Sequence, residues 1–221
     1  MTKDMVNILD EFKDKKILVI GDILLDRFIW GDIERINPEQ RAAPLVKVKY
    51  ENYVLGGAAN VANNIASLGG KCDLWGAVGR GINGDKIREL CKNNNIDLVN
   101  FYDKNPTIVK MRVMSDRQQI TRLDFGENSI EKIDKESEKN MLNLLNKNIN
   151  NYDFVILSDY DKTLFTQGLS YNLINIANNK KIGTLADLKP KNLNFFKECT
   201  IVCPNKHEAE EMSGIKYSNG N

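Results

Sequence analysis

The sequence predicts an α/β fold: a mostly parallel sheet with helices on both faces, and beside it a small antiparallel sheet. Two observations predict this. Continuous apolar runs of strand length alternate with helical patterns along almost the whole chain, as expected of strands buried on both faces. Two other stretches alternate apolar with polar residues, as strands with one exposed face do. Because a doubly covered sheet has no place for half-exposed strands, these stretches must form a separate layer.

The main sheet is expected to contain five strands, each an apolar run between turn signals. The first is Lys16–Gly21, with the sequence KILVIG. The other four are residues 72–78, 153–157, 182–186 and 199–203. The last of these contains a β-branched run, Thr200 to Val202, which predicts a buried strand, and Pro204 then ends it.

Five helices are expected between these strands, at residues 58–68, 84–93, 137–147, 166–178 and 205–213. In the first of them Val61, Ala62, Ile65 and Leu68 share one face, which is the spacing of an amphipathic helix. The separate antiparallel sheet, a β-lid, is expected from two segments, at about residues 27–50 and 107–124. In the second segment the chain is expected to turn near residues 115–117 and return as a hairpin.

Composition and charge exclude several classes of protein. The chain has 221 residues, of which 42% are hydrophobic and 28% charged, which is ordinary for one sizeable core. Lys plus Arg number 31 and Asp plus Glu 30, so neither a basic nucleic-acid-binding face nor an acidic tail dominates. No apolar run approaches the ~20 residues of a membrane span, and the first residues lack the layout of a secretory signal. With four scattered cysteines, we expect a reducing, cytoplasmic setting, with no nucleic acid and no membrane as partner.

Cys199, Cys203 and His207 are spaced by four and four, which suggests a metal site. Two thiols on a strand and a single histidine do not complete a tetrahedral ligand set, however. We therefore interpret them as structural residues, and Cys72 and Cys91 as small buried apolar residues.

Two motifs at strand ends suggest binding of a hydroxyl-rich ligand. Gly56 and Gly57 precede a helix and permit close approach of a ligand, and Asn60 in the first turn offers a donor and an acceptor to a sugar hydroxyl. A tight turn before a closely packed helix explains the same residues equally well. Asp22 and Asp26 follow the carboxyl end of a buried strand, where open α/β sheets bind ligands. Alternatively, Asp22 caps a turn and Asp26 is solvated.

The segment Gly79–Gly84 fits the dinucleotide-binding pattern G-x-G-x-x-G between a strand and a helix. The acidic residue that would bind the ribose is supplied only loosely, by Asp97 or Asp103. The pattern also lies on the second helical connection and not the first. A plain turn is the preferred interpretation, and NAD(P) binding is kept as an alternative.

Charged residues at two further places suggest an anionic ligand. Lys110 and Arg112 are two residues apart and share one strand face, and Arg122 and Asp124 could face the same side from the returning strand. Gathered like charges favour an acidic or phosphorylated substrate, whereas a solvated outer face is the alternative. The segment 204–208 stands at a strand-to-helix junction, where its Asn and Glu either face the ligand edge or cap the helix.

Taken together, these motifs resemble the ribokinase-like (PfkB) carbohydrate kinases. The resemblance is carried by Gly56, Gly57, Ala58, Asn60 and Ala62, followed by Gly69 and Gly79. Within that family, the chain is similar to the kinases of D-glycero-D-manno-heptose 7-phosphate, through residues 19–27, 34–39, 107–125, 157–160 and 204–208.

The resemblance implies that residues 1–221 form one incomplete sugar-kinase domain, Rossmann-like with a β-lid. It implies ATP- and Mg²⁺-dependent phosphorylation of a heptose phosphate at the anomeric hydroxyl, in the synthesis of nucleotide-activated heptose for lipopolysaccharide. The residues implied in binding the sugar phosphate are Asp22, Asp26, Gly56, Gly57, Asn60, Lys110, Arg112, Arg122 and Asp159. Those implied in binding ATP are Asp187, Lys189, Asn205, Lys206, His207 and Glu208, with Glu208 also at Mg²⁺. Pairing of two copies through the lid is implied as well.

The catalytic base of this family is the Asp of a Gly-Ala-Gly-Asp loop, and that motif does not occur in the chain. We therefore expect the base, and the C-terminal part of the family fold, to lie beyond Asn221. Three hypotheses follow: part of a sugar-phosphate kinase, a non-catalytic sugar-phosphate-binding pseudo-kinase, or an NAD(P)-dependent enzyme using Gly79–Gly84.

Overall fold

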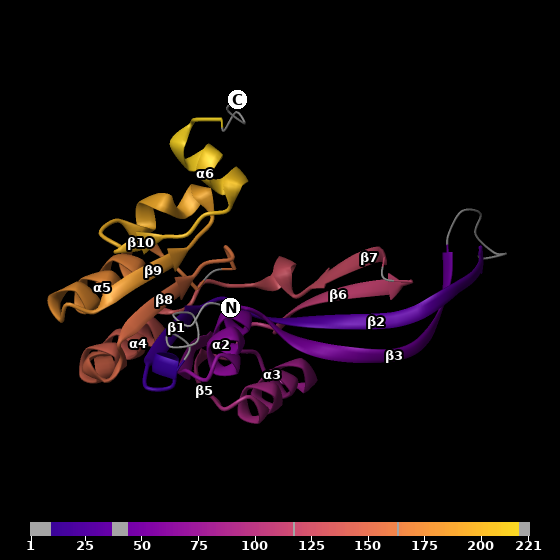
Figure 1. Cartoon of the computed structure of the whole chain (residues 1–221), viewed down its shortest axis with the longest axis horizontal. Coiled ribbons are helices and arrows are strands. Elements are labelled where there is room, and N and C mark those ends of the chain that lie inside the picture. The colour runs from indigo at the N-terminus through magenta and orange to yellow at the C-terminus, as the bar shows by residue number, and fades with distance from the viewer. Residues whose placement is uncertain (1–9, 37–43, 117, 163, 217–221) are drawn as a thin grey trace.

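The computed structural model describes residues 10–36, 44–116, 118–162 and 164–216. It shows a six-stranded sheet with helices packed against it and a separate four-stranded sheet that extends away from it (Figure 1). The predicted fold class is confirmed. Residues 37–43 of the predicted lid segment 27–50 lie outside the described residues. Within the described ranges, no helix is long and apolar enough to cross a membrane.

The main sheet has the strand order β10-β9-β8-β1-β4-β5, and every pair in it is parallel. Its strands are β1 (Lys16–Gly21), β4 (Lys71–Ala77), β5 (Ile96–Tyr102), β8 (Phe154–Ser158), β9 (Gly183–Asp187) and β10 (Ile201–Val202). Four of them match the predicted strands to within one residue at each end. β5 was not among the predicted strands, because Asp97 and Asn100 interrupt its apolar pattern.

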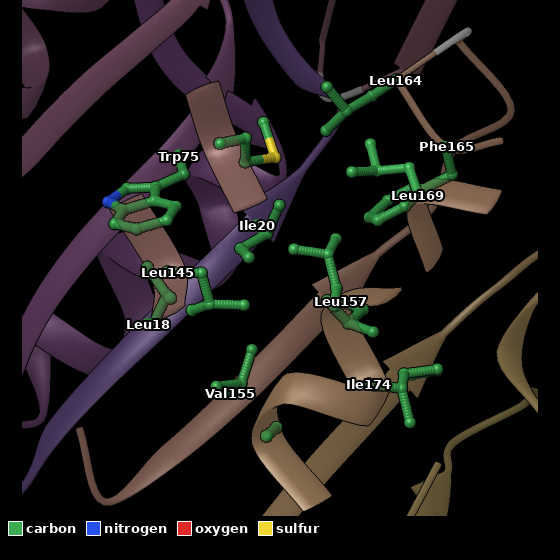
Figure 2. Close-up of a cluster of buried hydrophobic side chains, with 14 of the residues drawn as sticks. Leu18, Ile20, Trp75, Leu145, Val155, Leu157, Leu164, Phe165, Leu169 and Ile174 are labelled. Atoms are coloured by element: carbon green, nitrogen blue, oxygen red, sulfur yellow. The ribbon is translucent and has the colours of Figure 1, made fainter. Parts of the chain in front are cut away.

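Alternate residues of β1 point into two separate cores, which explains its continuous apolar sequence. Leu18 and Ile20 pack into the core under α4 (Lys135–Asn148) and α5 (Gln167–Asn179), together with Trp75 (Figure 2). Val19 packs into the opposite core, under α2 (Ala58–Ser67) and α3 (Ile82–Asn93). Helices on both faces leave only the edges and ends of the strands open, so the carboxyl ends of the strands are available for a ligand.

The helices begin where side chains or glycines cap them. The Thr166 side chain accepts a hydrogen bond from the Leu169 N–H and caps α5, and Asp134 caps α4 in the same way through the Ser137 N–H. The last helix is α6 (Lys206–Ser213), and three short 3₁₀ turns cover residues 127–129, 149–151 and 190–196. All five predicted helices are present, with shifts of a few residues at their ends.

The second sheet differs from the prediction in one respect. It has the order β3-β2-β6-β7 and consists of β2 (Ile23–Ile36), β3 (Pro44–Gly57), β6 (Ile108–Ser115) and β7 (Gln118–Phe125). The hairpin over 107–124 is confirmed. However, β2 and β6 are parallel, so the sheet is mixed and not antiparallel. The chain passes through the main sheet between these two strands, and this crossover connection lets them run in the same direction.

The prediction of a buried strand at 199–203 was wrong. The structure has only the two-residue strand β10, at the edge of the sheet, where Ile201 is 46% and Val202 36% exposed. Cys203 is exposed and Cys199 is half-buried. By contrast, Cys72 and Cys91 are buried as predicted, and burial raises the pKa of their thiols to about 12 and about 11.

Candidate functional site

Two regions of the structure gather polar side chains near the carboxyl ends of β1, β8 and β9. One is a face of the mixed sheet that carries Asp26, Lys110, Arg112 and Arg122. The other is formed by the ends of β8 and β9 and the start of α6, with Asp187, Lys189 and Glu208. We call them the charged face and the carboxyl-edge cluster.

The strand register places the predicted charges on one face of the mixed sheet. Asp26 on β2 is aligned with Lys110 on β6, and Lys110 with Asp124 on β7. Two residues further on, Arg112 is aligned with Arg122. Because aligned residues of neighbouring strands point to the same side, all five charged side chains lie on the charged face.

Carboxylates of the chain compensate two of the three cations. The Arg112 guanidinium donates a hydrogen bond to Asp26 Oδ1 and lies over the Phe28 ring, 5.3 Å from its centroid. Arg122 pairs with Asp124, with 2.9 Å between Nε and Oδ1. Lys110 is half-buried, and its ammonium group makes no ion pair or hydrogen bond with the part of the chain that the structure describes. It is therefore the cation of the charged face that is left for an anion.

The predicted glycine motif has two different roles. At Gly56, an added Cβ would lie 2.6 Å from Asp26 Oδ2, so this glycine leaves the space that the Asp26 carboxylate occupies. Gly57 ends β3 with a φ of 58°, a left-handed conformation that favours glycine, and the Ala58 N–H then donates to the Asp22 carbonyl oxygen. Asn60 lies in the first turn of α2 and is exposed, and its side chain forms no hydrogen bond within the described ranges.

Asp22, which was predicted to bind the substrate, has its carboxylate engaged inside the protein. Asp22 is 4% exposed, and its carboxylate accepts hydrogen bonds from the backbone N–H groups of Tyr160 (2.8 Å), Lys162 (3.0 Å) and Leu164 (3.3 Å). Burial raises the pKa of Asp22 to about 7, although these N–H groups oppose the rise. Asp22 thus holds the loop after β8, which is the turn-capping role that was the alternative interpretation.

The structure likewise does not present Asp159 to a ligand. Asp159 is 3% exposed, and its two carboxylate oxygens accept hydrogen bonds from the Asn192 side-chain amide and the Asp161 N–H, both at 2.8 Å. The carboxylate is therefore used inside the protein. A buried acid needs such partners, because an unpaired charge away from water is costly.

The carboxyl-edge cluster brings three of the predicted ATP-binding residues together. Lys189 Nζ lies 2.8 Å from Glu208 Oε1. Burial alone would raise the pKa of Glu208, but the hydrogen bonds from Lys189 and from the Asn205 N–H outweigh it and lower that pKa. The pKa of Asp187 is raised by its burial and then by the Glu208 carboxylate. The cluster therefore combines two carboxylates with one ammonium group.

Asn205 caps α6 in a capping box. Its side chain accepts from the Glu208 N–H and its own N–H donates to Glu208 Oε2, both at 3.0 Å. The helix-cap interpretation of this motif is thus correct, and Glu208 still faces the cluster. Lys206 is an exposed residue of the first turn. The structure does not bring His207 into the cluster, since its side chain is 94% exposed and lies nearest Glu210 on the helix surface.

The structure gives Gly79–Gly84 the features of a turn. Asp103, one of the acids considered for a ribose, forms an ion pair with Arg80 of the motif itself, with 2.6 Å between Nε and Oδ2. A Cβ at Gly79 would lie 2.3 Å from the Asn105 carbonyl oxygen, so this glycine is packed against the chain's own backbone. Ile82 at the start of α3 is 88% exposed. These observations favour the turn over a dinucleotide site.

Sequence reasoning missed Tyr160, which lies between the two regions. Its pKa is raised by burial and then by the carboxylates of Asp187, Asp26 and Glu208, with Lys189 acting in the opposite direction. The Lys189 ammonium lies 5.6 Å from the centroid of its ring. The signal that could have found Tyr160 was its place in the LSDY segment, directly after a buried strand.

The carboxyl-edge cluster is compatible with the phosphates of ATP and with a magnesium ion bound to them. Among the described residues, no three His, Cys, Asp or Glu side chains converge as a metal site. Mg²⁺ usually binds proteins through one or two carboxylates and completes its shell with water and substrate phosphates. Asp187 and Glu208 supply carboxylate oxygens of the kind that role needs, and a bound cation would lower the pKa of Asp187. Lys189 is the group that would face a phosphate.

A parallel sheet with cations and carboxylates at its carboxyl edge, next to a second charged sheet, is an arrangement that suits a small polar ligand at the ends of the strands. Comparison with models of protein families gives the family: residues 14–219 match the pfkB family of carbohydrate kinases. The chain belongs to this family, as the sequence motifs predicted.

Curated relatives are similar over nearly the whole chain. The bifunctional protein HldE of Aliarcobacter butzleri is 37% identical over 211 residues, which cover 95% of this chain and 44% of that protein. HldE of Helicobacter pylori strain G27 is 37% identical over 204 residues, covering 91% of this chain and 43% of that protein. The chain therefore spans less than half the length of these relatives.

Solved structures share the fold. The tetrameric inhibited form of phosphofructokinase-2 from Escherichia coli superposes with a TM-score of 0.67 at 17% identity, covering 93% of this chain and 66% of that one. Arabidopsis thaliana ribokinase complexed with ribose and ATP gives a TM-score of 0.63 at 14% identity, covering 91% and 64%. At these identities the likenesses show a shared fold.

Proposed function

We propose that this chain is the sugar-binding part of a kinase that transfers a phosphoryl group from MgATP to the anomeric hydroxyl of D-glycero-D-manno-heptose 7-phosphate or a related sugar phosphate. The charged face carries the proposal: Asp26, Lys110, Arg112 and Arg122 lie in register on one side of the mixed sheet, and Lys110 lacks a partner among the described residues. The motifs shared with heptose-phosphate kinases support this choice of sugar.

Each residue has a chemical task in this proposal. The Asp26 carboxylate and the Asn60 amide hydrogen-bond the sugar hydroxyls. Lys110, with Arg112 and Arg122 nearby, neutralises the phosphate already on the sugar. Phosphoryl transfer depends mainly on positioning and charge neutralisation, so fixing the acceptor hydroxyl is a large part of the catalysis.

The nucleotide would be held by the carboxyl-edge cluster. Lys189 would contact its phosphates, and Asp187 and Glu208 would contact the Mg²⁺ bound to them, which neutralises charge during the transfer. The general base that deprotonates the acceptor hydroxyl is not assigned to any residue of this chain. We propose that it is supplied by sequence beyond Asn221.

Isothermal titration calorimetry with D-glycero-D-manno-heptose 7-phosphate tests the proposal. The chain should bind it saturably, and Asp26→Ala should weaken binding by about tenfold or more, because a charged hydrogen-bond partner is lost. Asp97→Ala is the matched control, since Asp97 is an exposed carboxylate at the start of β5, at the opposite end of the strands. Absence of saturable binding by the unaltered chain would refute the proposal.

A sugar-phosphate-binding protein without transferase activity is the second candidate. The encoding DNA distinguishes the two. An in-frame Gly-Ala-Gly-Asp downstream of codon 221 supports the kinase, and a stop codon there supports the pseudo-kinase. Release of ADP from MgATP on addition of the heptose phosphate, measured on the full encoded protein, then decides the activity.

We also propose that two copies pair through the mixed sheet. Exposed apolar side chains on its strands support this: Val48 is 60%, Tyr50 59%, Leu123 45% and Phe125 46% exposed. Exposed apolar side chains on the strands of an open sheet favour association. Sedimentation velocity should show a dimer that Val48→Lys weakens, whereas a monomer at all concentrations would contradict the pairing.

A further inference from the structure

One polar group between the two regions has no task so far. The Tyr160 hydroxyl has no hydrogen-bond partner within the described ranges, although the residue is half-buried. Phenolic hydroxyls are both donors and acceptors of hydrogen bonds, so one that no protein group engages is open to a ligand. A half-buried tyrosine without a partner, next to a binding site, suggests that a ligand supplies it.

The surroundings of Tyr160 place it at the junction of the two regions. The Lys189 ammonium lies 5.6 Å from the centroid of its ring, and Lys189 itself is paired with Glu208 of the carboxyl-edge cluster. Burial raises the pKa of the phenol most, and the carboxylates of Asp187, Asp26 and Glu208 add to the rise, so the Asp26 carboxylate of the charged face also acts on it. The hydroxyl is therefore within the electrostatic reach of both groups that the proposed function assigns to the sugar and to the nucleotide.

The backbone of Tyr160 is fixed by a buried acid. The Tyr160 N–H donates to Asp22 Oδ2 at 2.8 Å, and the Lys162 N–H donates to the same oxygen at 3.0 Å. Asp22 is also anchored on both neighbouring elements, since its own N–H donates to the Ser158 carbonyl and its carbonyl accepts from the Ala58 N–H. One residue thus ties the end of β1, the start of α2 and the loop after β8 together.

We propose that the Tyr160 hydroxyl contacts the bound sugar phosphate at the junction of the charged face and the carboxyl-edge cluster, and that the Asp22 carboxylate is the positioning residue that holds Tyr160 there. The inference rests on the proposed function and adds a ligand-contacting residue to it. The partner of the phenol is a hydroxyl or phosphate oxygen of the sugar, because these are the hydrogen-bonding groups that such a ligand brings.

Calorimetric titration of heptose 7-phosphate into Tyr160→Phe tests the contact. This variant keeps the ring, its packing and the nearby ammonium, and removes one oxygen. We expect about fivefold weaker binding, as for the loss of one neutral hydrogen bond. Tyr171→Phe is the matched control, because Tyr171 is 57% exposed on α5 and its hydroxyl forms no hydrogen bond in the described part of the chain. Equal affinity of Tyr160→Phe and the unaltered chain would overturn the contact.

A double-mutant cycle tests the role of Asp22. Asp22→Asn keeps the size of the side chain but turns an amide group toward backbone donors, so it should displace the loop and weaken binding severalfold. If Asp22 acts by positioning Tyr160, that loss should largely disappear in the Tyr160→Phe background. A purely structural role would give the same loss in both backgrounds and would overturn the positioning role.

The folding of each variant is checked by its melting curve, and Asp22→Ser, which retains an oxygen acceptor, replaces Asp22→Asn if the latter does not fold. The outcomes also separate the two proposals. No binding of heptose 7-phosphate by the unaltered chain contradicts the proposed function and this inference with it. Binding that is indifferent to Tyr160→Phe contradicts the inference alone.

Discussion

Substitution of Gly56 by alanine tests the geometry of the charged face. The added methyl group would lie 2.6 Å from Asp26 Oδ2 and 3.1 Å from Asp26 Cγ, where ordinary contact begins at about 3.4 Å. The Asp26 carboxylate must therefore move by about 0.8 Å, the difference between 3.4 Å and 2.6 Å. Such a shift misaligns its hydrogen bond with Arg112 and the acceptor position offered to a sugar.

The expected cost follows from what the shift removes. A hydrogen bond to a charged group contributes about 1.5–3 kcal/mol, which corresponds to about tenfold to a hundredfold in affinity. We expect Gly56→Ala to weaken calorimetric binding of heptose 7-phosphate within this range. Gly168→Ala is the matched control, because a Cβ at Gly168 on α5 meets no atom within 4 Å.

A second background separates the clash from other effects. In Asp26→Ala the carboxylate is absent, so Gly56→Ala should cause little additional loss of binding or of melting temperature. The reasoning is refuted if Gly56→Ala binds as tightly as the unaltered chain, or if its loss is the same with and without the Asp26 carboxylate.

Three further substitutions have defined outcomes. Lys110→Ala should weaken the binding of heptose 7-phosphate by at least about tenfold and leave the binding of unphosphorylated heptose unchanged, since an ion pair at about 4 Å contributes up to about 4 kcal/mol near a protein surface. Equal losses of affinity for both ligands in calorimetry would contradict this prediction. Asn60→Ala should weaken sugar binding about fivefold. The melting temperature should stay the same, because the Asn60 side chain is exposed and forms no hydrogen bond in the described ranges. Unchanged affinity would remove Asn60 from the site. Burial raises the pKa of Asp22 from 3.8 to about 7 in the folded chain, so folding favours the protonated carboxyl group. The contribution of Asp22 to the free energy of unfolding is therefore fully present below about pH 4 and is lost as the pH rises through 7. In urea unfolding at several pH values, the free energy of unfolding of the unaltered chain should fall by a few kcal/mol across this range, and that of Asp22→Asn should not show this fall. Parallel pH profiles for the unaltered chain and Asp22→Asn would contradict the prediction.

The sequence was sufficient for features that depend on local patterns. The apolar run of β1 and the amphipathic spacing of α2 placed these elements to within one residue. The alternation in β6 and the charges two residues apart put Lys110 and Arg112 on one face, and the strand register confirms it. Each of these features follows from residues close together in the chain, where the periodicity of helices and strands applies.

The sequence was insufficient where the partner is distant in the chain. Asp22 meets its backbone donors across 138 to 142 residues, so no local pattern distinguished a loop-holding acid from a sugar-binding one. The same holds for Asp159 and Asn192, which are 33 residues apart. At 199–203, the β-branched run correctly predicts a strand, but the position of β10 at the sheet edge, which exposes it, depends on the order of strands in space.

The way in which the mixed sheet joins the main sheet has a mechanical consequence. β2 begins at Ile23, directly after Asp22, and continues for 14 residues; at about 3.3 Å per residue it extends about 46 Å. Asp26 lies only three residues from this origin. If the mixed sheet rotates about the start of β2, the far end of β2 therefore moves several times further than Asp26. Asp26, the acid proposed to bind the sugar, lies close to the start of β2, so bending of the far end of the mixed sheet changes its position very little.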